Sequence, residues 1–363
     1  MSAQRKDDHV RLAIEQQDAP RGVNQFDEVS FVHHALAGID RPDVSLATDF
    51  AGISWPVPIY INAMTGGSVK TGVINRDLAI AARETGVPIA SGSMNAYLKD
   101  PSCAGTFSVL REQNPDGFVM ANVNANASVD NAWRAIELIQ ANALQIHINT
   151  AQETAMPEGD RSFSAWAGQI EKIAAAVDIP VIVKEVGNGL SRQTVETLKD
   201  LGVSVADVSG RGGTDFARIE NGRRELGEYA FLHGWGQSAP ACLLDAQGAG
   251  LPLLASGGVR SPLDVARALA LGAHGVGASG GFLRTLLDGG VDALIAQLTT
   301  WLDQLAALQT MLGARTPAGL RHCDVLIHGS LRDFCADRGI GTGPLARRSS
   351  SAETPHETTG STR

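Results

Sequence analysis

One lysine of this sequence stands inside a run of apolar, β-branched residues. Lys184 follows Val181, Ile182 and Val183, which is the pattern of a buried strand. A buried ammonium group needs a partner, because burial without one is costly. Two partners are open: a carboxylate on a neighbouring barrel strand, or the N1/C2 carbonyl edge of a reduced flavin, whose electronics a nearby charge can tune. We favour the flavin.

A histidine, an asparagine and a glutamate mark the end of a second apolar run. Side chains alternate along a strand, so His147 and Asn149 point to the same side, and Glu153 follows in a loop. A lone strand histidine is more often a hydrogen-bonded core residue than a catalyst. Glu153 suits Mg²⁺, which takes one or two carboxylates beside water and phosphate oxygens, but it equally suits the acidic first turn of a helix.

Two turns of small residues near the end of the chain are candidates for holding a phosphate group. Gly257 and Gly258 follow one apolar run, and Ala278 and Ser279 follow the next, so backbone N–H groups of both turns can face an anion. Tight turns alone would explain either one, whereas two in succession favour phosphate. The stretch 275–280 also fits the G-x-G-x-x-G pattern of dinucleotide-binding folds, but that pattern belongs in the first strand–helix unit and here comes last.

These residues require a scaffold that brings strand ends together. Short apolar runs alternate with Gly-, Ser- and Asn-rich turns and amphipathic segments; Ser261, Pro262 and Asp264, for example, predict a helix start, and Gly272 its end. The predicted strands are 58–63, 87–91, 118–123, 144–149, 181–186, 205–209, 253–256 and 275–278. This pattern predicts an α/β fold, a closed TIM (β/α)8 barrel whose active site lies at the carboxyl ends of the strands.

We expect one domain over residues 1–340. The first 50 residues form an arm ahead of the barrel, and the long charged connection 213–235 has the length of a lid. Arg5 and Lys6 suit a diphosphate clamp if the arm folds over the barrel mouth, although a solvated pair of terminal charges is the simpler interpretation. After residue 340 the composition shifts to Gly, Ser, Thr, Pro and Arg, which predicts a disordered tail at 341–363.

The composition narrows the class of protein. The chain has 363 residues, a net charge of −9, 44% hydrophobic residues and 40 glycines. The acidic balance argues against nucleic acid or an anionic membrane as a partner. Four separated cysteines suggest neither a zinc site nor a disulfide framework, and no signal segment or membrane span is evident. We therefore expect a soluble, cytoplasmic protein that captures an anionic ligand locally.

Several of these segments together resemble type 2 isopentenyl-diphosphate isomerase, an FMN-dependent family. The resemblance extends from about residue 5 to about residue 340, and its motifs fall at predicted strand ends. They are 5–9, 63–67, 92–94, Asn122, 147–153, 184–187, 209–214, 256–260 and 278–279. The resemblance implies an FMN-linked oxidoreductase-like barrel that assembles as a homo-oligomer, a tetramer or an octamer.

The same resemblance implies a reaction and assigns roles to residues. Isopentenyl diphosphate would become dimethylallyl diphosphate by a 1,3-allylic proton shift in isoprenoid biosynthesis, with reduced FMN as acid and base, NADPH as reductant and Mg²⁺ on Glu153. His147, Gln152 and Lys184 would be catalytic. Substrate would meet Arg5, Lys6, Ser93, Asn95, His147 and Gln152. FMN would be held by Ala63, Met64, Thr65, Ser93, Asn122, Lys184, Ser209, Thr214, Gly257, Gly258, Val259, Ala278 and Ser279.

Two positions depart from the family pattern, and two other functions compete with it. Asn95 stands where an arginine is expected, which would remove a diphosphate contact, and residues 237–239 differ above the expected pocket. An FMN-dependent 2-hydroxy-acid dehydrogenase would need a His/Arg pair, such as His233 or His274 with Arg260. A non-catalytic barrel that binds a phosphorylated ligand is the other alternative, because fold does not determine function.

Overall fold

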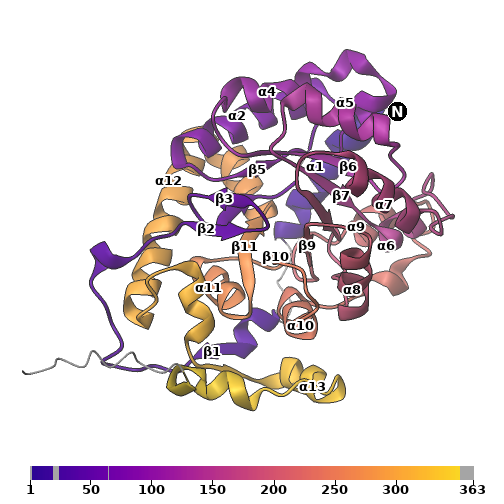
Figure 1. Cartoon of the computed structure of the whole chain (residues 1–363). Coiled ribbons are helices and arrows are strands. Elements are labelled where there is room, and N and C mark those ends of the chain that lie inside the picture. The colour runs from indigo at the N-terminus through magenta and orange to yellow at the C-terminus, as the bar shows by residue number, and fades with distance from the viewer. Residues whose placement is uncertain (1, 19–23, 64, 352–363) are drawn as a thin grey trace, which may run out of the picture.

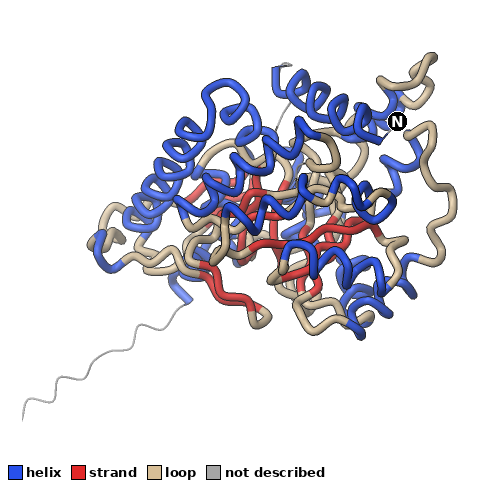
Figure 2. The backbone as a smooth tube through the Cα atoms, turned by 90° about the horizontal axis from the view of Figure 1, so that it is seen from above, coloured by secondary structure: helices blue, strands red, loops and turns tan. Residues whose placement is uncertain are grey.

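The computed structural model describes residues 2–18, 24–63 and 65–351 of the chain (Figure 1). Eight parallel strands close into a barrel in the order β10-β11-β4-β5-β6-β7-β8-β9. Their bounds are β4 Ile59–Ile61, β5 Ile89–Ala90, β6 Val119–Asn124, β7 Ala143–His147, β8 Val181–Lys184, β9 Val205–Asp207, β10 Leu253–Ser256 and β11 Ala273–Ala278. Each predicted strand overlaps one of these, so the TIM-barrel prediction is confirmed. Figure 2 shows the strands in the middle of the fold with helices around them.

At least one helix follows each barrel strand. The helices are α1 Ser2–Asp18, α2 Val69–Thr85, α3 Asn95–Lys99, α4 Gly105–Gln113, α5 Val129–Ile139, α6 Thr150–Ala155, α7 Trp166–Ala176, α8 Arg192–Asp200, α9 Phe216–Asn221, α10 Ala239–Asp245, α11 Pro262–Ala270, α12 Gly280–Leu312 and α13 Gly329–Asp337. The predicted helix start is confirmed at α11, where the Ser261 side chain accepts a hydrogen bond from the Asp264 N–H. None of the described helices has the length and apolarity needed to cross a membrane.

An apolar layer closes the amino-terminal end of the barrel. The strands β2 Thr48–Phe50 and β3 Ile53–Trp55 form an antiparallel hairpin there. Trp55 packs with ring centroids 5.0 Å from Phe50, 5.3 Å from Tyr60 and 5.6 Å from Phe118. Met120, Ile182 and Leu254 from the barrel strands join the same buried cluster. Close packing of this kind excludes solvent, so the opposite end of the barrel is the one available to a ligand.

A strand that precedes the barrel in the chain pairs with a strand that follows it. Strand β1 (Val29–Phe31) pairs antiparallel with β12 (Val325–Ile327). After α13 the chain continues into a 3-10 helix, η6 (Gly343–Ser351), where the Ser349 N–H and hydroxyl each donate to Asp324 at 2.7 Å. The disordered tail predicted from residue 341 therefore starts too early, because residues 341–351 belong to the folded chain. Residues 352–363 lie outside the described part of the structure.

Candidate active site

A cavity of about 510 Å³ opens at the carboxyl ends of the barrel strands. This volume is typical of small-molecule sites. The predicted site residues that line it are Ala63, Thr65, Ser93, Asn95, Asn122, His147, Gln152, Glu153, Lys184, Ser209, Thr214, Gly257, Gly258, Val259, Ala278 and Ser279. Met64 lies outside the described residues, and Arg5 and Lys6 lie in α1 but their side chains are outside the described part. The structure thus brings the candidate residues from all eight strand ends to one place.

Backbone turns after β10 and β11 form a cradle at one side of the cavity. Gly257 and Gly258 have φ of +90° and +79°, and a Cβ added to Gly257 would lie 1.8 Å from the carbonyl oxygen of Gly210. Only glycine meets both conditions. Helix α12 begins at Gly280, directly after β11, so its first N–H groups are near the same turns. This arrangement of backbone N–H groups and a helix start is the kind that binds phosphate.

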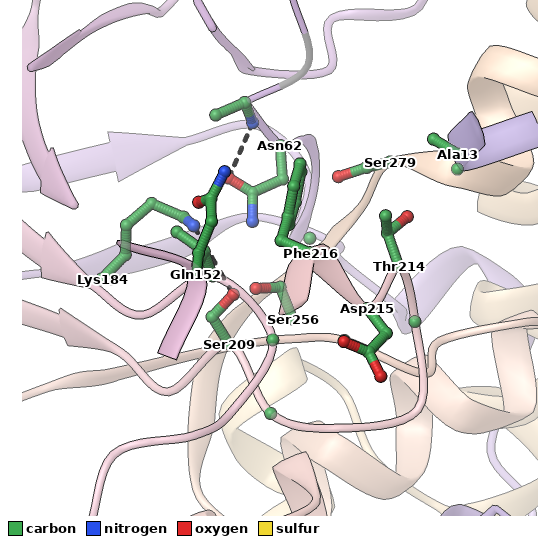
Figure 3. A pocket seen from close by; sticks show the side chains of 18 of the residues that line it. Ala13, Asn62, Gln152, Lys184, Ser209, Thr214, Asp215, Phe216, Ser256 and Ser279 are labelled. Atoms are coloured by element: carbon green, nitrogen blue, oxygen red, sulfur yellow. Dashed lines mark hydrogen bonds between the residues drawn. The ribbon is translucent and has the colours of Figure 1, made fainter. Parts of the chain in front are cut away.

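Lys184 lies at the other side of the cavity and is buried, with 5% of its surface exposed. Its Nζ donates to the carbonyl oxygen of Glu185 at 2.5 Å and lies 3.5 Å from the Ser209 hydroxyl. Burial lowers the pKa of Lys184, and the charges of Asp207 and Glu185 oppose that shift. Figure 3 shows Lys184 and Ser209 close together, with Ser279 across the cavity from them. Lys184 therefore faces the cavity and also lies near a buried carboxylate. The structure is compatible with both predicted partners, a carboxylate on a neighbouring strand and the edge of a flavin.

A chain of amides connects His147 to the opposite side of the barrel. Asn122 accepts a hydrogen bond at 2.8 Å from Nδ1 of His147 through Oδ1, since its Nδ2 already donates to Gln145 at 3.0 Å. The Nε2 of Gln145 lies 3.5 Å from Asn62 Oδ1, and Asn62 Nδ2 donates to Asp207 at 3.2 Å. Because the Asp207 carboxylate can only accept, Asn62 must donate to it with its NH2 group. Each following amide then accepts with its oxygen from the next residue of the chain. The last oxygen of the chain, Asn122 Oδ1, therefore accepts from His147, so the Nδ1 of His147 carries a proton.

Glu153 and Asn149 form a polar corner at the cavity wall. The structure places Glu153 in the first turn of α6, so the prediction that it lies in a loop is wrong. Its Oε1 accepts from Asn149 Nδ2 at 3.0 Å, and its Oε2 accepts from the Asp160 N–H at 2.8 Å. Asn149 is 4% exposed, and its Oδ1 has no hydrogen-bond partner among the described residues. A buried acceptor without a donor beside a carboxylate suits a cation or a polar ligand.

Glu220, which we did not predict from the sequence, is a buried carboxylate at the same wall. It lies in α9, and its Oε1 is 3.0 Å from both Gln152 Nε2 and His9 Nε2, while Arg223 pairs with Oε2. Burial raises the pKa of Glu220, but the bonds from His9, Gln152 and Arg223 outweigh it and bring the pKa to about 2. In the sequence Glu220 stands among exposed charges of a long connection, so no pattern marks it as buried.

The arm and the long connection both cover the cavity, and they are joined to each other. His9, Val10 and Ala13 of α1 line it, as do Phe216 and Trp235 from the connection.

Paired hydrogen bonds hold this cover together. The Gln16 side chain donates to the Asp215 carbonyl at 3.0 Å and accepts from the Asp215 N–H at 2.8 Å. Ser68, which caps α2, donates to Asp7 at 2.7 Å and anchors the start of α1 to the barrel. In the segment that departs from the family pattern, Ser238 caps α10 and bonds Gln25 of the arm. The cover is therefore tied to the barrel at several points.

The comparisons with known proteins agree with this geometry. The chain matches a family model for FMN-dependent dehydrogenases over residues 111–325. It is 82% identical to the isopentenyl-diphosphate delta-isomerase of Streptomyces sp. (strain CL190) over 100% of this chain and 99% of that protein. The chain belongs to the FMN-dependent isopentenyl-diphosphate delta-isomerase family. The enzyme of that name from Nocardia farcinica (strain IFM 10152) is 60% identical over 96% and 97% of the two chains. The predicted family is thereby confirmed.

Solved structures similar to this isomerase-family chain are other flavin barrels. Mandelate oxidase with benzoyl-formic acid has a TM-score of 0.61 at 18% identity and covers 88% of this chain and 90% of its own. A mutant flavocytochrome b2 with pyruvate bound has a TM-score of 0.62 at 22% identity, with coverage of 82% and 75%. At such identities the similarity establishes the fold alone. It agrees with the FMN-linked oxidoreductase-like barrel that we predicted.

The His/Arg pair of the competing dehydrogenase function is not assembled in this member of the family. His274 lies near the start of β11 and packs against Phe50 in the apolar layer, where burial lowers its pKa to about 4. His233 is exposed and is not among the residues that line the cavity. Arg260 pairs with Asp27 and Asp264. No histidine of the predicted pair therefore lies beside Arg260 at the cavity.

Proposed function

We propose that this chain converts isopentenyl diphosphate to dimethylallyl diphosphate in the cavity at the carboxyl end of its barrel, with reduced FMN bound. The observation that carries the proposal is the meeting of the predicted cofactor and substrate residues in one cavity, in a chain 82% identical to a named isomerase. The reaction adds a proton at one carbon of the alkene and removes one from another, so no net electron transfer is needed.

The cavity lining fits FMN. The cradle at Gly257 and Gly258 and the start of α12 suit its phosphate, and Lys184 suits the N1/C2 edge of its ring. When bound, reduced FMN supplies an electron-rich ring that can donate and accept a proton. An ammonium group beside that ring stabilises its negative charge in a site shielded from water. Asn122, Ser209 and Ala63 also line the cavity and would be within reach of the bound ring.

The polar corner fits the diphosphate of the substrate and a magnesium ion. Glu153 supplies one carboxylate, and the free Oδ1 of Asn149 lies on the same wall. Magnesium takes its other ligands from water and phosphate oxygens, so a single protein carboxylate is enough. Gln152, held by Glu220, and His147, when its Nε2 also carries a proton, can then donate to the diphosphate. An alkene has no polar handle of its own, so diphosphate binding provides the positioning.

Finer parts of the proposal concern the partners of the enzyme. We infer that NADPH reduces the bound FMN, that Arg5 and Lys6 of α1 meet the diphosphate, and that the chain assembles as a tetramer or octamer in the cytoplasm. The position of α1 over the cavity supports the role of Arg5 and Lys6, since neighbouring His9 and Ala13 line it. Light scattering behind size exclusion measures the assembly, and a monomer would contradict it.

Anaerobic turnover tests the proposal. The protein is incubated with isopentenyl diphosphate, Mg²⁺, FMN and NADPH, and dimethylallyl diphosphate is compared with NADPH consumed. We expect product in large excess over NADPH. Glu153→Gln is expected to lose most of the Mg²⁺-dependent rate, whereas Glu196→Gln, on the exposed face of α8, retains it. A yellow protein with reducible flavin that forms no product would overturn the substrate assignment, and one product per NADPH would indicate net redox chemistry instead.

A further inference from the structure

Asp207, at the end of β9, is a buried carboxylate that does not itself line the cavity. It is 0% exposed. Its Oδ2 accepts from the Tyr60 hydroxyl at 2.6 Å and from Asn62 Nδ2 at 3.2 Å, and its Oδ1 accepts from the Ser256 hydroxyl at 2.9 Å and from the Ser209 N–H at 3.1 Å. Asn62, Ser209 and Ser256 line the cavity (Figure 3). Asp207 therefore lies directly beneath the cavity floor and holds three of its polar groups.

Asp207 is the buried carboxylate on the strand next to Lys184; Glu185, adjacent to Lys184 in the chain, is also buried, and burial raises its pKa to about 7. Lys184 and Asp207 are register partners on the parallel strands β8 and β9. They are connected through Ser209, whose hydroxyl lies 3.5 Å from the Lys184 Nζ and whose N–H donates to Asp207. No salt bridge joins the pair directly among the described residues, so the coupling is electrostatic and acts through this serine.

The hydrogen bonds of Asp207 explain why a carboxylate, and not an amide, occupies this position. All of its partners are donors, and only an ionised carboxylate can accept from four groups without presenting an N–H to one of them. A buried carboxylate without a nearby positive charge is costly, however, and Lys184 is the cation on the neighbouring strand. The same argument applies to Lys184, whose ammonium is buried at the cavity wall.

We propose that Asp207 is a positioning residue for the reaction: the buried counter-charge that keeps Lys184 in its ammonium form at the wall of the cavity. This proposal rests on the proposed function, in which Lys184 stabilises the charge of reduced FMN. Asp207 acts through Lys184 and touches neither cofactor nor substrate. Its fixed acceptor geometry also directs Asn62, the first amide of the chain that ends at His147.

The first test measures bound FMN in Asp207→Asn as a function of pH. Without the counter-charge, burial lowers the pKa of Lys184 further than in the wild type. Once Lys184 has lost its proton, the preference for reduced over oxidised FMN falls roughly tenfold, which is about one pKa unit of interaction. Glu185, whose pKa burial raises to about 7, titrates in both proteins. The plot of FMN midpoint potential against pH should therefore show one additional break in Asp207→Asn that the wild type lacks. The alkaline limb of kcat moves to lower pH in parallel.

Tyr60→Phe is the matched control, since it removes one donor to Asp207 and keeps the charge. It is expected to follow the wild-type pH dependence of the flavin potential, even if the protein becomes less stable. A merely structural Asp207 would give the same curves for both variants. If Asp207→Asn shows no break beyond those of the wild type, or if Tyr60→Phe shows the same additional break, the proposal is overturned.

A second test does not require Asp207→Asn to fold alone. Lys184→Met leaves Asp207 as an unpaired buried charge, whereas Lys184→Met with Asp207→Asn leaves none. We expect the double variant to unfold at a higher urea concentration than Lys184→Met. A double variant less stable than Lys184→Met would contradict the pairing. The FMN potential and the urea unfolding do not depend on isoprenoid turnover. A chain that binds FMN but fails to isomerise would therefore refute the proposed function, and these two measurements would still test Asp207.

Discussion

The two ends of the barrel are built from the same strands but hold opposite kinds of side chain. At the amino-terminal end, Phe50, Trp55 and Tyr60 pack into a buried apolar layer. At the carboxyl end, lysine, histidine, amides and carboxylates surround about 510 Å³ of open space. In a parallel barrel each strand contributes some residues to the amino-terminal end and others to the carboxyl end. Residues that stabilise the fold and residues that bind ligands can therefore lie at different ends of the same strands.

Tyr60 lies at the boundary between the two ends and shows how they are joined. Its ring packs on Trp55 in the apolar layer, and its hydroxyl donates to Asp207 beneath the cavity. Burial, followed by the charge of Asp207, raises the pKa of Tyr60 well above its usual value, so the phenol remains a donor. If the separation is real, substitutions in the apolar layer change stability without changing FMN binding, whereas substitutions at the carboxyl end change ligand binding or the pH dependence of stability. The following predictions test it, from the largest effect to the smallest.

Trp55→Ala should have the largest effect, on stability alone. Emptying a fully buried aromatic site costs about 3–5 kcal/mol, because the apolar contact is lost and a cavity remains. Guanidinium unfolding measures this loss, and Leu36→Ala, at a fully exposed position, serves as the control. FMN titration of the folded variant should give the wild-type affinity. Weaker FMN binding without loss of stability would break the comparison.

Glu220→Gln should remove a pH-dependent contribution at the carboxyl end. The pKa of Glu220 is about 2 in the folded chain against a usual 4.5, so its charge contributes about 3 kcal/mol. Because the folded pKa is depressed, this stability is fully present above about pH 4.5 and is lost as the pH falls toward 2. The unfolding free energies of wild type and variant, measured from about pH 2 to 5.5, should converge at the acidic end. A difference that stays constant with pH would show that the carboxylate charge is not the cause.

Gly257→Ala should weaken FMN binding about 100-fold, close to 3 kcal/mol, and leave the apolar end intact. The new Cβ would meet the Gly210 carbonyl oxygen at 1.8 Å in a backbone with φ of +90°. Flavin fluorescence titration measures the affinity. Gly168→Ala in α7, where nothing lies within 4 Å of the new Cβ, is the matched control and should leave FMN affinity unchanged. Equal FMN affinity in both variants would rule out the cradle as the phosphate site.

Gln16→Ala should have the smallest effect, since it changes only the cover. It removes two hydrogen bonds between α1 and Asp215, which together stabilise the closed position of the arm over the cavity by about 1–2 kcal/mol. We expect KM for isopentenyl diphosphate to rise about 5- to 10-fold with kcat nearly unchanged, because the reacting groups are not touched. Arg11→Ala, on an exposed part of the same helix, should leave KM unchanged. A fall in kcat with constant KM would place Gln16 in the chemistry instead.

The barrel and most of the cavity lining could be predicted because both follow short-range patterns. Lys184 ends an apolar strand and Gly257 begins a small-residue turn, and strand order then brings their ends together. Asp207 carries the same signal as Lys184, an ionisable residue in an apolar strand, and could have been found by asking which carboxylate faces it. His147 and Asn149 both line the cavity as predicted, but β7 ends at His147 and Asn149 is the N-cap of α6, so strand alternation is not the reason.

The parts that were missed depend on long-range contacts. Glu220 is buried only because His9 and Gln152, far away in the chain, pack against it. The segment 341–351 has the composition of a disordered tail, but hydrogen bonds to distant residues, such as that of Ser349 to Asp324, hold it against the fold. Glu153 was assigned to a loop because α6, in which it lies, has only six residues, too few for a periodic pattern.

A crystal structure of the protein grown with FMN tests the central claim most directly. The account predicts the flavin at the carboxyl end of the barrel, with its phosphate against the backbone of Gly258 and Ser279 and its N1/C2 edge facing Lys184, while the packing around Trp55 is unchanged. A flavin bound elsewhere, or with its phosphate turned toward Lys184, would contradict the assignment of the two sides of the cavity and the role proposed for Asp207.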